Sequence, residues 1–302
     1  MKKGTVIALI IAACCLVAGI CIMAAALIGI DFHVKELSVM EPKTTTHTVS
    51  ESFLDIDIRT IEADIKLLPA EDGTCRVVCE ETDKISHAVT VAGNTLTIRR
   101  HDSRKWYEKI NLYFPTLSLT VYLPQEEYAA LTLQSVSGDI TISDAFYFGN
   151  TAISSTSGNL TDHARTNGNL TASTVSGNIT LSQHTGGHLA VSTTSGEIHL
   201  RDMSASAVSV STTSGNIAMT DVVAVGMLQA ESVSGEVYLT RVDGDRLTLS
   251  TVSGNITASL LSGKDFSYDT VSGHVSLPPD TAGAGACQLE TTSGNIRITI
   301  EA

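Results

Sequence analysis

The acidic residues that could perform chemistry in this chain recur at related places in a repeated motif. Glu197 and Glu236 each follow a Ser-Gly pair, and Glu231 precedes one. Glycoside hydrolysis requires two carboxylates about 5–9.5 Å apart. If the repeats stack as coils, Glu197 and Glu236 are two coils apart with Asn216 between them, roughly 10 Å away. The same position holds Asn in five units and His274 in another. We therefore expect a solvated turn face, with no catalytic residues.

Serine and histidine offer no better catalytic arrangement. A serine precedes every repeat glycine, which a requirement of the fold explains, and no Gly-x-Ser-x-Gly elbow occurs. His184 and His188, in QHTGGH, flank a glycine turn without a nearby Cys or third His, so we interpret them as a surface loop. Asp221, Asp243 and Asp245 attract calcium only through their charge. The sequence therefore predicts neither a metal site nor a cofactor.

The cysteines are interpreted as small buried hydrophobic residues. Cys75 and Cys79, in CRVVC, face the same side of an extended strand, but ~13 Å separates them at about 3.3 Å per residue. That distance is beyond the reach of a disulfide. No spacing typical of a metal or redox motif occurs among the six cysteines, three of which lie in the apolar N-terminal segment.

A basic and aromatic stretch, RRHDSRKWYEKI, interrupts the acidic background and is the best local candidate for ligand contact. Arg104, Lys105, Trp106 and Tyr107 form its centre, and Trp106 is the only tryptophan of the chain. Arginine and aromatic residues are enriched at binding hot spots, and tryptophan can stack on sugar rings. The alternative interpretation is a charged hairpin loop whose tryptophan seals the end of the fold.

A motif of about 20 residues positions these groups and recurs nine times. It is typified by STVSGNITLS and consists of a Ser-Gly pair flanked by alternating apolar residues. Successive repeat glycines are 19–21 residues apart: Gly138, Gly158, Gly177, Gly196, Gly215, Gly235, Gly254, Gly273 and Gly294. Alternation with period two predicts half-buried strands. Units this short bury an apolar face only by stacking, so we predict an all-β, single-stranded β-solenoid of about nine coils.

The turn of each coil explains the residue types of the motif. Glycine can adopt positive φ without steric cost, which we expect at a shared corner. Asn or Asp after the glycine should bond neighbouring turns and line up as a ladder. Ser or Thr three residues before each glycine, together with the serine directly before it, should form parallel hydroxyl rows. Such rows could engage a repetitive polymer such as a glycan, or could simply be a solvated corner.

Residues 50–130 are predicted to be an N-terminal β cap, and residues 131–302 the repeats. The cap includes a degenerate coil, Leu54–Leu67, in which Ala63 takes the glycine position. A hairpin should turn at Gly93-Asn94. Residues 31–49 suit a short stalk. The final strand, NIRITIEA, ends the rod without an obvious cap, and an open edge invites end-to-end self-association.

The first thirty residues predict a membrane anchor. Residues 6–30 are uncharged and mostly apolar, which exceeds the roughly 20 residues that a spanning helix needs. Lys2 and Lys3 precede this segment, so the positive-inside rule places residues 1–30 as a cytoplasmic N-terminus and transmembrane anchor. Residues 31–302 would then be extracytoplasmic. IAAC, Ile11 to Cys14, offers an alternative, because it fits a bacterial lipoprotein cleavage pattern.

The charge of the chain excludes one class of partner. With 32 acidic and 19 basic residues, the formal net charge is −13. Nucleic-acid binding needs clustered Lys and Arg, which this balance does not provide.

Cap strands followed by recurring SVSGDI and TTSGNI units resemble the bacterial putative-adhesin family of toast-rack-like β-solenoids. The resemblance covers roughly residues 50–302 and depends on the number and spacing of the repeats. It implies a right-handed β-helix-like fold exported or anchored at the bacterial membrane, and no agreed catalytic residues. We therefore expect a non-enzymatic surface-binding protein or adhesin, with a surface glycan or cell-envelope component as partner. The alternatives are an envelope sensor that contacts membrane proteins and, less favoured, an enzyme acting on polysaccharide.

Overall fold

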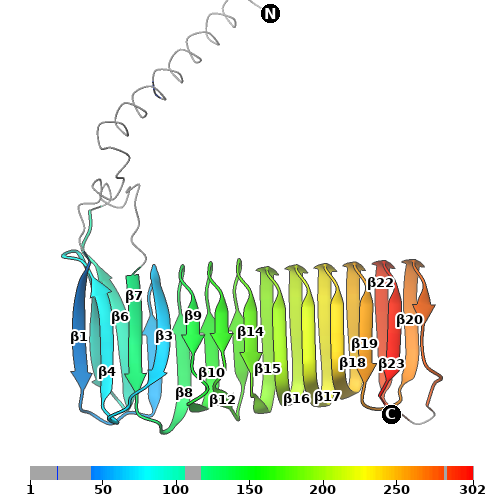
Figure 1. Cartoon of the computed structure of the whole chain (residues 1–302), viewed down its shortest axis with the longest axis horizontal. Coiled ribbons are helices and arrows are strands. Elements are labelled where there is room, and N and C mark those ends of the chain that lie inside the picture. Colours follow the sequence, from blue (N-terminus) through cyan, green and yellow to red (C-terminus); the bar gives the residue numbers. More distant parts are fainter. Residues whose placement is uncertain (1–18, 20–41, 106–116, 282–283, 302) are drawn as a thin grey trace, which may run out of the picture.

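The computed structural model describes Gly19 and residues 42–105, 117–281 and 284–301 of the chain. Within these ranges the fold is all-β, a β-solenoid (Figure 1). No helix in the described part is long and apolar enough to cross a membrane. The predicted anchor, apart from Gly19, lies outside the described residues.

The strands fall into a cap and a rod. The cap strands are β1 Lys43–Val49, β2 Asp55–Arg59, β3 Ala63–Pro69, β4 Cys75–Glu81, β5 Ile85–Ala92, β6 Thr95–Asp102 and β7 Leu117–Leu123. The rod strands are β8 Glu127–Gln134, β9 Ile140–Ile142, β10 Tyr147–Ser154, β11 Leu160–Asp162, β12 Arg165–Thr166, β13 Leu170–Ser173, β14 Ile179–Ser182, β15 Thr185–Ser195, β16 Ile198–Ser214, β17 Ile217–Ser234, β18 Val237–Ser253, β19 Ile256–Leu260, β20 Asp265–Ser272, β21 Val275–Ser276, β22 Ala286–Ser293 and β23 Ile296–Ile300.

Coils pair in parallel, and equivalent residues of successive repeats are partners. Ile198 of β16 is opposite Ile217 of β17, which is opposite Val237 of β18. Inward positions carry Ile, Leu, Val and Ala, and they form one continuous buried core along the rod. The nine Ser-Gly corners are separated by eight full turns, so the rod has about eight turns. The predicted strands and their parallel stacking are thus confirmed, with about eight turns in place of the nine coils predicted.

Glycine recurs at each corner because successive corners are in close contact. A Cβ added at Gly196 would lie 1.9 Å from the carbonyl oxygen of Gly177, and the equivalent distance at Gly215 to Gly196 is also 1.9 Å. Gly215 has a φ of 154°, but Gly196 and Gly254 are not among the residues with positive φ. The predicted reason, a left-handed backbone, therefore applies to some corners only, whereas close stacking applies to all of them.

The predicted ladder beside the corners is present. The backbone N–H of Asn178 donates to Asn159 Oδ1 at 3.0 Å, and that of Glu197 donates to Asn178 Oδ1 at 2.8 Å. Asp64 of the degenerate coil begins the series, because it accepts from the N–H of Asp139 at 2.9 Å. These bonds satisfy polar groups at the corners, where the strand ladders are interrupted.

The degenerate coil is confirmed in register as well as in type. β3 pairs with β9, so that Ile65 is opposite Ile140, and a Cβ at Gly138 would collide with the carbonyl of Ala63. β2 lies between β8 and β6, so this first coil is internal and later cap strands cover it. The hairpin at Gly93-Asn94 is also confirmed, since β5 and β6 are antiparallel and both turn residues have positive φ.

Two segments differ from expectation. Residues 43–49, assigned to a stalk, form β1, which pairs antiparallel with β4 (Figure 1). Four of its seven residues are threonines, and the inward row of Thr45, His47 and Val49 is more buried than the row between them. A β-branched segment with one partly buried face forms a strand readily, which the polarity of the stretch concealed.

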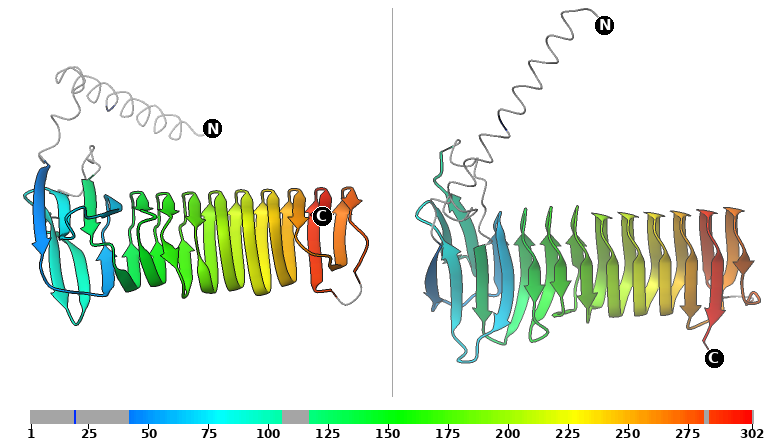
Figure 2. Two further views of the ribbon diagram at one scale, coloured as in Figure 1. Left: turned by 60° about the horizontal axis from the view of Figure 1, so that its bottom comes forward. Right: turned by 45° about the horizontal axis from the view of Figure 1, so that its top comes forward.

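The C-terminal coil is not at the end of the rod. β22 pairs with β18 on one side and with β20 on the other, and β23 likewise lies between β19 and β21. Figures 1 and 2 show the last strands, β22 and β23, between the coil of β18 and β19 and the coil of β20 and β21. The expected open edge at NIRITIEA is therefore wrong, because the outermost strands at this end are β20 and β21.

Candidate binding surfaces

In the described part of the basic stretch, Arg100 and Arg104 form an ion-pair cluster with Glu62 and Asp102. Arg104 is buried; its Nε and Nη2 donate to the two carboxylate oxygens of Asp102, both at 2.9 Å. Arg100 lies 3.2 Å from both Glu62 and Asp102. The hydrogen bond from Arg104 holds the pKa of Asp102 well below its usual range. Arg104 therefore stabilises the cap through these ion pairs, and its predicted role in ligand contact stays a prediction.

The other members of that predicted site have different outcomes. Lys105 is exposed at the end of the described cap. Trp106 and Tyr107 lie outside the described residues. Their role in ligand contact stays a prediction.

One of the two predicted hydroxyl rows is internal. The residues three before each repeat glycine share the inward side of the strand, and most of their hydroxyls bond within the rod. Thr193 Oγ1 donates to the carbonyl of Gly177 at 3.2 Å, and Thr251 Oγ1 donates to that of Gly235 at 2.9 Å. Both threonines are buried. They lie an even number of residues from the apolar core positions of the same strand. This spacing could have shown from the sequence that their side chains face inward.

The two residues directly before each repeat glycine are exposed in all nine units and form what we call the corner ridge. The second residue before the glycine is always Val or Thr, and the next is always Ser. Parallel pairing aligns the serines of the ridge, since Ser195 is opposite Ser214 and Ser214 is opposite Ser234. The ridge therefore repeats methyl and hydroxyl groups at the strand spacing of about 4.8 Å.

A shallow groove of about 360 Å³ lies on the outer face of the strands that follow the corner. His163, His199 and Arg201 line it, from β16 and the turn after β11. His163 Nδ1 is 2.9 Å from Ser182 Oγ, and His199 Nε2 is 3.2 Å from Glu197 Oε2. Among the described residues Arg201 has no ion-pair partner, which makes it an available cation on an acidic rod.

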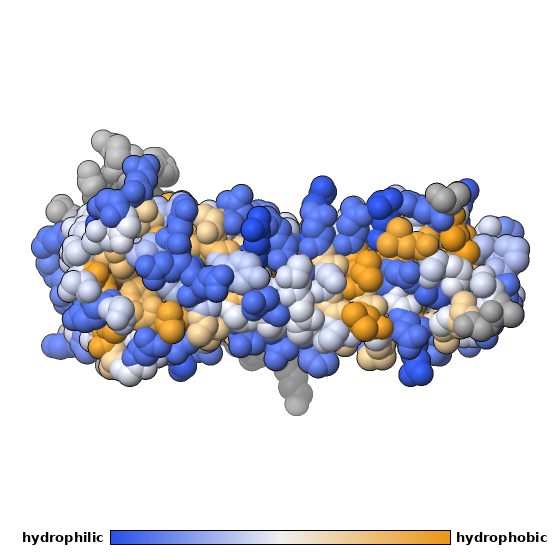
Figure 3. Space-filling model, turned by 90° about the horizontal axis from the view of Figure 1, so that it is seen from below, coloured by the Kyte–Doolittle hydropathy of each residue, from blue (hydrophilic) through white to orange (hydrophobic). Residues whose placement is uncertain are grey.

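Each coil has further turns on the side of the rod opposite the Ser-Gly corners, which we call the lower turns. In the described residues these turns have no exposed row that repeats from coil to coil. Figure 3 shows this side as largely hydrophilic, with separate apolar patches. The exposed apolar residues here are Val223, Val225 and Met227 in one coil and Leu261 in another. Because they belong to individual coils, they do not form a surface that repeats along the rod.

The candidate catalytic carboxylates belong to the ladder. The amide of Asn216 donates to Glu197 Oε1 at 3.2 Å, and Asn216 Oδ1 accepts the backbone N–H of Glu236 at 2.9 Å. Asn216 therefore separates the two carboxylates, as the repeat spacing predicted. The calcium candidates are also engaged, because Asp221 pairs with Arg241 and Asp243 pairs with Lys264, each at 2.6 Å.

Two buried ionisable residues in the lower turns were not identified correctly from the sequence. His184, interpreted as part of a surface loop, is fully buried, and burial lowers its pKa. Asp162 is also fully buried, and burial raises its pKa to about 7. Its Oδ1 accepts the N–H of Ala164 at 2.9 Å. The signal for Asp162 was its place in the repeat, where the other units have an apolar residue.

The cysteine interpretation is confirmed for the described residues. Cys75, Cys79 and Cys287 are free and buried, and burial is the main cause that raises the pKa of each thiol to about 12. A protonated, enclosed thiol is an inert hydrophobic group unless a metal ion displaces its proton.

Comparison with known proteins finds similar solved structures and one matching family. The similar solved structures include one described as a putative adhesin from Bacteroides fragilis (17% identity, TM-score 0.44, 85% of this chain and 97% of that chain), and one described as a putative lipid binding protein from Parabacteroides distasonis (18% identity, TM-score 0.48, 86% and 97%). No curated protein matches. The family Toastrack DUF4097 matches residues 53–299, from the cap to the last strand, and the chain belongs to that family.

Proposed function

We propose that this protein is a non-enzymatic binding protein of the bacterial cell surface, an adhesin-like rod anchored by its N-terminal apolar segment. The observation that carries the proposal is the corner ridge, in which all nine repeats expose the same pair of residue types. A surface that repeats about every 4.8 Å suits a repetitive, largely uncharged ligand such as a glycan of the envelope.

The charge of the rod supports this choice of ligand. The chain has a net charge of −13, which disfavours anionic polymers. Ser and Thr hydroxyls can both donate and accept hydrogen bonds, and the Val and Thr methyl groups can contact sugar ring faces. The groove beside Arg201 adds one cationic position on another face of the rod, outside the corner ridge.

The absence of catalysis is part of the proposal. Its support is the arrangement of Glu197 and Glu236, whose ladder partner Asn216 keeps them in separate coils. We expect Glu197→Gln to bind the ligand as the unchanged protein does. The amount of soluble reducing ends released from isolated cell walls should also be no lower with the variant than with the unchanged protein.

The proposed location follows from the N-terminal sequence. Residues 6–30 are uncharged and follow Lys2 and Lys3, which supports a cytoplasmic N-terminus and an extracytoplasmic rod. Protease treatment of intact cells, which should degrade the rod only if it is outside the membrane, tests this location.

The binding test is co-sedimentation of the purified full-length protein with isolated cell walls and with intact cells. We expect saturable binding that a ridge variant, Thr194→Lys with Thr213→Lys, weakens at least about tenfold, because charged side chains would obstruct the ridge. Ala190→Lys with Ser209→Lys places the same charges in the same strands, away from the ridge, and is the control. Without binding to walls or cells, the alternative is an envelope sensor, which cross-linking in the membrane would test.

A further inference from the structure

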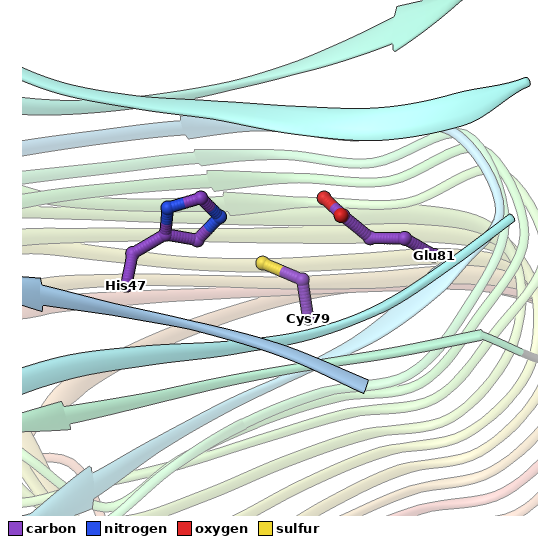
Figure 4. A group of neighbouring side chains, drawn as sticks. All are labelled: His47, Cys79 and Glu81. Carbon is purple, nitrogen blue, oxygen red and sulfur yellow. The ribbon is translucent and has the colours of Figure 1, made fainter. Parts of the chain in front are cut away.

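Four potential metal ligands from three strands meet at the capped end of the rod. His47 lies on β1, and Cys79 and Glu81 lie on β4 (Figure 4). In this antiparallel pair His47 is opposite Val77, so its side chain shares the inward face with Cys79. One ligand atom from each of the three residues lies within 4.8 Å of the others. No spacing in the sequence indicated this, because 32 residues separate His47 from Cys79.

His87 of β5 supplies the fourth group. Its Nδ1 is 3.5 Å from Glu81 Oε1, and its side chain is only 1% exposed. Neither of its ring nitrogens has a hydrogen-bond partner, and the buried Nε2 of His47 also has none. Buried polar atoms are normally satisfied, so two imidazoles with unpaired nitrogens beside a thiol and a carboxylate indicate a missing partner.

We propose that His47, Cys79, Glu81 and His87 bind one zinc ion. Two imidazoles, a thiolate and a carboxylate are ligand types that zinc accepts in tetrahedral geometry. Bonds of about 2.0–2.3 Å to the ion would hold the ligand atoms roughly 3.3–3.8 Å apart. His47, Cys79 and Glu81 already place one ligand atom each within 4.8 Å of the others, so changes of side-chain rotamer can bring them to that range. His87, whose Nδ1 is 3.5 Å from Glu81 Oε1, would turn toward the same point to complete the set. Binding releases the Cys79 proton to solvent, and the thiolate and carboxylate then balance the charge of the dication.

The neighbouring cations do not oppose this arrangement strongly, because each has its own carboxylate. Arg100 of β6 is opposite His87 and lies 3.2 Å from Glu62 and from Asp102. Lys43 is opposite Glu81 and pairs with Asp83 at 2.7 Å. The carboxylate of Glu81 also accepts the backbone N–H of His87 at 2.5 Å, which fixes its position beside the imidazole.

The position of the site indicates a structural role. β1 and β4 belong to one side of the cap, whereas β5 belongs to the hairpin on the other side. An ion held by all three strands would join the two sides at the end of the rod, where no further coil of the described residues covers the core. All four positions around the metal would be taken by protein, which is typical of structural zinc sites and leaves none for a substrate.

Cobalt substitution of the full-length protein, purified in detergent with reductant, tests the proposal. Co²⁺ at a tetrahedral thiolate site gives strong visible ligand-field bands and a near-ultraviolet thiolate-to-cobalt charge-transfer band. We expect both in the unchanged protein, with displacement by about one equivalent of Zn²⁺ per chain. Cys79→Ala should lose the charge-transfer band. Cys75→Ala removes a buried thiol from the same face of the same strand and should keep it.

Two further variants separate loss of a ligand from loss of folding. His47→Ala changes a half-buried residue of the edge strand, and His87→Gln keeps a polar side chain; each should abolish tetrahedral binding while the far-ultraviolet circular dichroism stays unchanged. The proposal is overturned if the unchanged protein gives only the pale spectrum of octahedral cobalt. It is equally overturned if the charge-transfer band survives Cys79→Ala or disappears with Cys75→Ala.

Discussion

At the residue scale, the fold depends on the absence of side chains at the corner, and this gives a sharp prediction. Gly196→Ala should destabilise the protein by at least about 2–3 kcal/mol, because its Cβ would lie 1.9 Å from the Gly177 carbonyl oxygen. Gly226→Ala is the control, since its Cβ would meet only the Ser206 oxygen at 3.1 Å. Urea unfolding measures both; equal losses would show that stacking at the corner is not the reason for glycine.

Asp162 gives a prediction about pH. Its carboxyl has a pKa of about 7 in the fold, against an ordinary value of 3.8. Between these values the folded protein keeps a proton that the unfolded chain has released, so stability falls as pH rises through this window. The slope is at most about 1.4 kcal/mol per pH unit. Asp162→Asn, which keeps the oxygen facing Ala164, should flatten that part of the profile.

Urea midpoints measured from about pH 4 to pH 8 test this dependence. Asp269→Asn is the control, because Asp269 is exposed on β20 and the chemical change is the same. If both variants preserve the slope of the unchanged protein, other groups cause it.

At the element scale, the alternation of strands extends to the threonines before the corner. Thr193 is buried and donates to Gly177, whereas Thr194 is exposed at a position where other repeats have Val. Thr193→Val should therefore cost about 0.5–1.5 kcal/mol, the net value of a typical hydrogen bond. Thr194→Val should change the unfolding free energy by less than about 0.5 kcal/mol. A reversed order would mean that the hydroxyl rows have been assigned to the wrong sides.

Local periodicity predicted most of these elements. The strands, the register of the repeats and the place of Ala63 all followed from residue spacing, because each coil copies its neighbour. Periodicity gave no information where neighbours are not copies. β1 and β4 are unlike in sequence, and 32 residues separate His47 from Cys79, so neither the strand pair nor the metal-ligand cluster had a sequence signal. The burial of Arg104 likewise had no sequence signal, because its partner Glu62 lies 42 residues earlier in the chain, directly before β3.

At the scale of the whole molecule, the repeats cannot specify their own order. The coils of β20–β21 and β22–β23 carry the same Ser-Gly motif, so either could follow β18. Their inward residues explain the observed choice. Leu289 and Ile296 of the inner coil are fully buried, whereas Tyr268 of the outer coil is 57% exposed. The inner coil with these aliphatic residues occupies the interior, and the coil with a tyrosine at the equivalent position can tolerate the end.

This order relocates the surface for self-association. Among the described strands β20 pairs only with β22, and its other edge presents backbone groups that a second molecule could pair with. We therefore expect residues 31–302 to associate end to end, with a weight-average sedimentation coefficient that rises with concentration. Tyr268→Lys should suppress the rise by placing a charge on the open end. Tyr238→Lys is the control, because Tyr238 is similarly exposed, at 53%, on the side of the rod. A sedimentation coefficient independent of concentration, or equal suppression by both variants, would contradict association through β20.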